Sequence, residues 1–161
     1  MYRNGHLGAA LLVYAPLGGA LLAGGFEAAA LVGGGVMLAL AGLPDVDHRI
    51  PFVEHRGCTH SVAFALLVGA VLGGAGVALG LESEGGNPAA LGAFGFVLGT
   101  LAVVTHLLAD VVTPKGITPF WPVSDVHYTL SLTRADNVVA NYVLLTAGVA
   151  VTAGVLLVAG S

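Results

Sequence analysis

SVAFALLVGAVLGGAGVALGL, residues 61–81, decides the fold because no charged side chain interrupts it. A helix needs about 20 predominantly apolar residues to cross the hydrocarbon core of a bilayer, and this stretch has that length. Four further apolar segments are of similar length: Leu7–Ala23, Phe26–Leu43, Ala89–Val112 and Val138–Ala159. The sequence therefore predicts an all-α, polytopic membrane bundle of about five transmembrane helices, forming a single domain over residues 1–161.

The composition favours the same class. Hydrophobic residues make up 57% of the chain and charged residues only 9%, whereas soluble domains average about 25% charged residues. Lipid solvates an apolar exterior that water would not, so we expect the phospholipid bilayer to be the main partner. The net charge of −4 and the absence of a basic run give no footprint for nucleic acid, and none is expected to bind.

Glycines spaced four residues apart predict close helix packing. Small residues at this spacing let membrane helices approach one another. The pairs are Gly69 and Gly73, Gly76 and Gly80, and Gly95 and Gly99.

The charges predict the orientation. With five spans, the N-terminus and the loops Pro44–His60 and Thr113–Asn137 lie on one side, and the loop Glu82–Pro88 lies on the other. Every Lys and Arg falls on the N-terminal side: Arg3, Arg49, Arg56, Lys115 and Arg134. The positive-inside rule makes this side cytoplasmic.

The first apolar segment has an alternative interpretation as a signal peptide, with Arg3 before the apolar run and small residues near Ala28–Ala30.

Residues able to bind a metal gather on that side as well. All six histidines fall there: His6, His48, His55, His60, His106 and His127. His106 and Asp110 are four residues apart in an apolar helix, so their side chains share a face, and ionisable groups inside a membrane helix indicate function. Asp45, Asp47 and His48 follow directly after a helix end. Imidazole and carboxylate together suit Zn, Mn or Fe.

Each feature alone has a structural explanation. A histidine near the membrane interface is usually a snorkelling or capping group, and Asp110 could bond Thr113 or pair with Lys115. Cys58 is expected to be a buried filler rather than a ligand. The gathering of all six histidines on one side favours a metal site over these separate explanations.

Four stretches resemble the YdjM-like family. They are His6 near the start, PDVDH (Pro44–His48), HRGCTHS (His55–Ser61) and HLLADVVTPKG (His106–Gly116). They occur in the family's order and spacing and cover nearly the whole chain. Members of the family are described as membrane-bound, metal-dependent hydrolases of the inner membrane, distantly similar to zinc-dependent phospholipases C and single-strand nucleases.

The resemblance implies a set of site residues. The metal ligands would be His6, Asp47, His60, His106 and Asp110, with zinc the expected ion. Asp45, His55 and Arg56 would be catalytic, with Arg56 holding a substrate phosphate in its guanidinium fork. The C-terminal glutamate ligand of the soluble enzymes has no clear counterpart; Asp136, Asn137 and Asn141 are the nearest polar groups.

The expected function is hydrolysis of a phosphoester in an amphiphilic or lipid substrate at the cytoplasmic interface of the cell membrane. The metal would polarise the phosphoryl group and lower the pKa of a water. A metal-ion transporter is one alternative, although it would need ligands at mid-membrane or on both sides. A non-enzymatic scaffold or regulator is the other, since the family has been linked to the LexA repressor.

Overall fold

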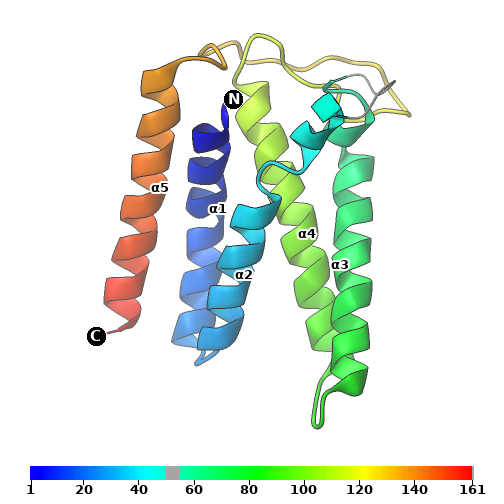
Figure 1. Cartoon of the computed structure of the whole chain (residues 1–161), viewed down its shortest axis with the longest axis vertical. Helices are drawn as coiled ribbons and strands as arrows, with labels where there is room; N and C mark the ends of the chain where they lie inside the picture. The colour runs from blue at the N-terminus through cyan, green and yellow to red at the C-terminus, as the bar shows by residue number, and fades with distance from the viewer. Residues whose placement is uncertain (50–54, 161) are drawn as a thin grey trace.

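The fold is a bundle of apolar helices, described here in a computed structural model for residues 1–49 and 55–160. Five helical segments are long and apolar enough to cross a membrane by length and composition, the second of them, Glu27–Arg49, counting α2 together with the 3₁₀ helix that follows it. They run antiparallel in sequence order, with short turns at one end and long connections at the other (Figure 1). The bounds are α1 Arg3–Ala23, α2 Glu27–Leu40, α3 Val62–Glu82, α4 Pro88–Val111 and α5 Val138–Ala159. The described residues contain no β-strand, so the all-helical prediction is confirmed.

The second apolar segment ends earlier than predicted. α2 stops at Leu40, and the chain turns before a six-residue 3₁₀ helix, η1 (Pro44–Arg49). Gly42 and Pro44 explain the break, because glycine is flexible and the ring of proline prevents an α-helix from continuing through it. A second 3₁₀ turn, η2 (Cys58–His60), precedes α3. These two turns carry the polar motifs of the sequence.

Helices α3 and α4 pack against each other more extensively than any other pair, followed by α1 against α5. Glycine makes the first contact possible. A methyl group placed on Gly99 would lie 2.7 Å from the carbonyl oxygen of Val68, and one on Gly76 would overlap the carbonyl of Leu91. The glycine spacing in the third and fourth segments therefore marks a helix interface, as predicted.

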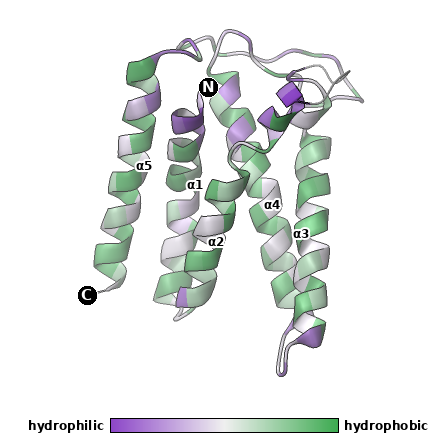
Figure 2. Ribbon diagram, viewed as in Figure 1, coloured by the Kyte–Doolittle hydropathy of each residue, from purple (hydrophilic) through white to green (hydrophobic). Residues whose placement is uncertain are grey.

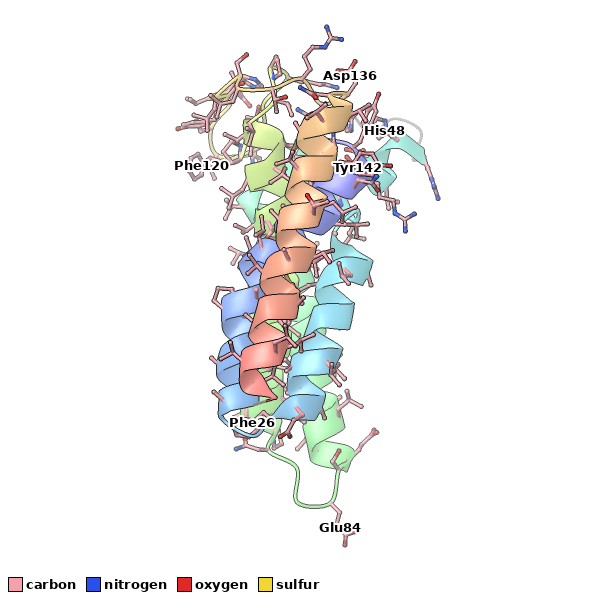
Figure 3. All side chains as sticks on the ribbon, turned by 90° about the vertical axis from the view of Figure 1, so that its left-hand side faces the viewer. Phe26, His48, Glu84, Phe120, Asp136 and Tyr142 are labelled. Atoms are coloured by element: carbon pink, nitrogen blue, oxygen red, sulfur yellow. The ribbon has the colours of Figure 1, made fainter. Side chains whose placement is uncertain are left out.

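Polar residues gather at one end of the bundle (Figure 2). The N-terminus, η1, η2 and the connection between α4 and α5 all lie at this end, and it contains His48 and Asp136, whereas Glu84 lies at the opposite end (Figure 3). We call it the polar end. The structure thus brings the predicted loops together at one end; the prediction that this end faces the cytoplasm stays a prediction.

Candidate metal centre

Four side chains from three separate elements meet at the polar end. Asp45 comes from η1, His60 from η2, and His106 and Asp110 from one face of α4. His60, His106 and Asp110 are fully buried, whereas the side chain of Asp45 is 32% exposed. One ligand atom of each lies within 4.8 Å of the others. We call these four residues the metal group.

The spacing of the four atoms fits a tetrahedral ion. The Nε2 atoms of His60 and His106 are 3.3 Å apart. Each lies 3.5 Å from Asp45 Oδ1, and they lie 3.4 and 3.6 Å from Asp110 Oδ2. Four ligands about 2.1 Å from one zinc ion are separated by about 3.4 Å, so the side chains already stand where such an ion needs them. Asp110 Oδ2 is buried and has no hydrogen-bond partner. A bound cation would give this oxygen the partner that it lacks.

Neighbouring groups aim both histidines at this point. His106 Nδ1 donates to the carbonyl oxygen of Ala41 over 2.7 Å, so Nε2 is left with a free lone pair. Thr59 Oγ1 donates to Asp47 Oδ2 over 2.8 Å and can accept from His60 Nδ1 at 3.0 Å. Both imidazoles are thereby held in the tautomer that a metal ligand requires.

His6 lies beside the metal group rather than within it. Its ring stacks on that of His106, with centroids 3.7 Å apart and planes inclined by 5°. Its Nε2 lies 3.6 Å from Asp110 Oδ1 and 3.8 Å from Asp45 Oδ2, the carboxylate oxygens that the metal group does not use. This Nε2 also donates to the carbonyl oxygen of Met1 over 2.9 Å. The predicted ligand is therefore adjacent to the site, on its α1 side.

A second group of possible ligands shares Asp45 with the first. It consists of Asp45, Asp47, His48 and His55, with ligand atoms again within 4.8 Å of one another. Asp47 belongs here and not to the metal group. His55 Nδ1 donates to Asp47 Oδ1 over 3.0 Å, and its ring stacks on His48 at 3.6 Å. Burial lowers the pKa of His55, while the hydrogen bond to Asp47 acts in the opposite direction.

The sequence matches the profile of the family described as YdjM inner membrane protein over residues 1–160. The chain belongs to the YdjM inner membrane protein family. This confirms the resemblance seen in the four motifs, and the description agrees with five apolar helices in contact with a bilayer. No curated protein and no solved structure matches the chain.

Arg56 of this YdjM-family chain is engaged with the buried carboxylate. One terminal nitrogen donates to Asp110 Oδ1 over 3.0 Å. The other donates to Thr113 Oγ1 and to the carbonyl oxygen of Gly116, both over 2.9 Å. The Met1 ammonium also contacts Asp110 Oδ1. These contacts fix the Asp110 carboxylate with Oδ2 turned toward the histidines. The prediction that Arg56 holds a substrate phosphate stays untested.

The C-terminal candidates lie apart from both groups. Asp136 accepts two hydrogen bonds from Arg134, which lower the pKa of its exposed carboxyl group. Asn137 caps α5 by accepting from the Ala140 amide, and Asn141 accepts from the amide of Tyr2. Among the described residues, Asp136 belongs to neither group of possible metal ligands.

His48 was named from the sequence beside Asp45 and Asp47 but was assigned to no site, and no functional role was expected for Thr59. His48 stands in the PDVDH motif, so its position beside two carboxylates was the available signal. Nothing local distinguishes Thr59 from a helix cap, because its bond to Asp47 depends on how η1 and η2 meet. Residues 50–54 of the polar motif lie outside the described residues.

Proposed function

We propose that this YdjM-family protein is a membrane-bound, metal-dependent hydrolase that cleaves a phosphoester in an amphiphilic substrate. The observation that carries the proposal is the metal group, with its four donor atoms at tetrahedral spacing and its unpartnered Asp110 Oδ2. Two imidazoles and two carboxylates form a donor set suited to zinc, manganese or iron.

Asp45, His60, His106 and Asp110 would hold the ion. A divalent cation there supplies Lewis acidity to a phosphoryl group and favours ionisation of a water at neutral pH. Asp45 is the partly exposed member of the metal group, so we assign the side of the centre that is open to solvent and substrate to the side where Asp45 lies. The buried histidines close the opposite side and exclude bulk water, which strengthens electrostatic interactions at the reacting group.

His55 is the candidate proton carrier. Asp47 accepts from its Nδ1, which leaves Nε2 free to accept a proton from a nucleophile. The ring lines a cavity of about 270 Å³ together with Thr118, Trp121 and Asp125. Arg56 is assigned as a positioning residue, because it holds the Asp110 carboxylate in place.

In the second group, Asp45, Asp47 and His48 would hold a further cation, while His55 keeps the role of proton carrier. Because Asp45 belongs to both groups, it would be a ligand in both sites. Paired metals stabilise the attacking and leaving oxygens of a phosphoryl transfer. Occupancy of two ions per chain would support this arrangement.

We assign the reaction to the cytoplasmic face. All five Lys and Arg residues belong to segments at the polar end, and cytoplasmic loops of membrane proteins carry such an excess. A centre at the end of the spanning helices lies at the depth of lipid headgroups, which favours a substrate held in the bilayer.

The test is to purify the full chain in mild detergent without chelator, then measure bound metal and phosphate release from mixed lipid substrates. Wild type is expected to carry at least one equivalent of metal and to be active. His106→Ala should lose both, and Glu84→Ala at the opposite end serves as the control. If the protein is a scaffold, wild type and both variants should release phosphate equally, at the background rate. If it is a transporter, it should move the ion across the membrane of vesicles without releasing phosphate.

A further inference from the structure

A cavity of about 420 Å³ opens at the polar end between the start of α1 and the turn from α2 into η1. Ligand sites in proteins commonly have volumes of about 300–1,000 Å³. Its lining includes His6 and the partly exposed Asp45. Asp45 also belongs to the metal group, so a molecule in this cavity lies against the candidate centre. We call it the arginine cavity, after Arg3 and Arg49, which line it.

Arg3 and Arg49 line the arginine cavity and provide its positive charge. Among the described residues, neither forms an ion pair or a side-chain hydrogen bond. The other two arginines are engaged, Arg56 with Asp110 and Arg134 with Asp136. Two free guanidinium groups facing one cavity suit an anion, and the guanidinium fork matches the oxygens of a phosphate.

The remaining lining is apolar and leads toward the bilayer. Leu7 and Leu43 line the arginine cavity, and Leu38 lines both this cavity and a neighbouring groove of about 240 Å³. The groove runs between α1, α2 and α5 and is lined almost entirely by apolar residues. Gly35 lies on its wall, and a Cβ atom added there would meet nothing within 4 Å. A polar cavity beside an apolar groove, with Leu38 lining both, suits a headgroup in the cavity and an acyl chain in the groove.

We propose that the arginine cavity binds the phosphate headgroup of an anionic lipid, with Arg3 and Arg49 as its anchors and an acyl chain in the groove beside Gly35. This inference rests on the proposed function in that it names the substrate class of the same centre. The acyl chain is held on the bilayer side of the cavity, so the phosphoester of the lipid faces Asp45 of the metal group.

The test uses a phosphonate analogue of phosphatidic acid, whose carbon–phosphorus bond is not cleaved by phosphoester hydrolysis. Its affinity for the full, metal-loaded chain is measured by titration in native mass spectrometry. We expect Arg3→Gln and Arg49→Gln each to weaken binding about fivefold, from the contribution of one arginine near a membrane surface. Arg134→Gln is the matched control and should bind like wild type. If the two cavity variants match Arg134→Gln, the inference is wrong.

A second pair of variants tests the acyl groove. Gly35→Leu fills the groove and should weaken binding of the long-chain analogue but not of soluble glycerol phosphate. Gly74→Leu is the control, because a Cβ there also meets nothing within 4 Å and it lies on α3. If glycerol phosphate displaces the analogue at equal concentration, the cavity recognises phosphate alone and the lipid assignment is wrong.

The same samples separate this inference from the proposed function. Binding that depends on Arg3 and Arg49 in a protein that cleaves no phosphoester would support the lipid site and contradict the hydrolase. Hydrolysis in a protein whose Arg3 and Arg49 variants bind the analogue normally would support the hydrolase and contradict the lipid site.

Discussion

His60 and His106 bring their Nε2 atoms to 3.3 Å of each other, although 46 positions separate them in the chain. Two imidazole nitrogens at this distance either share one proton or bind one cation. Each ring has its Nδ1 engaged elsewhere, His106 with Ala41 and His60 with Thr59. With both Nδ1 atoms protonated, both Nε2 lone pairs point at the same space, and a cation resolves their repulsion.

The first prediction concerns the ligands themselves. His60→Ala and His106→Ala should each abolish stoichiometric metal binding, because a tetrahedral site with three protein ligands loses much of its affinity. Metal content by inductively coupled plasma mass spectrometry checks this. His127→Ala removes a histidine at the same end that belongs to neither group, and it should retain the metal.

The second prediction concerns Thr59, which links His60 to Asp47. Thr59→Val keeps the shape but removes the hydroxyl that accepts from His60 and donates to Asp47. Loss of such a supporting hydrogen bond weakens metal affinity about 10–100-fold. Competition with a chromophoric chelator measures the change. Thr146→Val, on exposed α5, removes a hydroxyl bonded only to its own helix and should leave affinity unchanged.

Much of this site could be predicted from sequence, because its parts are local. The i, i+4 spacing of His106 and Asp110 placed both on one helix face, and the structure buries both in one site. The assignment of Asp45 and Asp47 was harder. They are two residues apart in η1, and only the turn of the 3₁₀ helix and its contact with η2 decide that Asp45 joins the metal group and Asp47 the second group.

The fold could be predicted for the same reason, and the prediction was wrong in one place, the end of α2. Apolar length alone identifies a membrane helix, so five spans followed from hydropathy. The end of α2 did not, because Ala41 and Leu43 are as apolar as the helix before them. The early end has a consequence for the site, since it leaves the Ala41 carbonyl free to orient His106.

The third prediction concerns the packing of α3 against α4, the helix that carries His106 and Asp110. Gly99→Val should destabilise the protein by about 1–3 kcal/mol, the usual effect of overpacking, because its Cβ would meet the Val68 carbonyl oxygen at 2.7 Å. Unfolding in detergent, followed by circular dichroism, provides the measurement. Gly74→Val places the same side chain in open space on α3 and should cost far less. Equal stability of the two variants would show that α3 and α4 do not pack as described.

The fourth prediction concerns orientation. In a Cys58→Ser background, Ser83→Cys should react with a membrane-impermeant maleimide added to spheroplasts, and Val123→Cys should react only after lysis. Both residues are exposed, Val123 with 92% of its surface accessible, and they lie at opposite ends of the bundle. The reverse pattern would place the polar end outside.

The most direct test of the central claim is X-ray absorption at the edge of the bound metal, measured on the full chain loaded with zinc. We expect about four nitrogen and oxygen ligands at about 2.0–2.1 Å, with outer-shell scattering from two imidazole rings, and loss of the zinc edge in His60→Ala. A bound ion surrounded by oxygen alone, or His60→Ala that retains as much zinc as wild type with the same spectrum, would contradict the metal centre formed by Asp45, His60, His106 and Asp110.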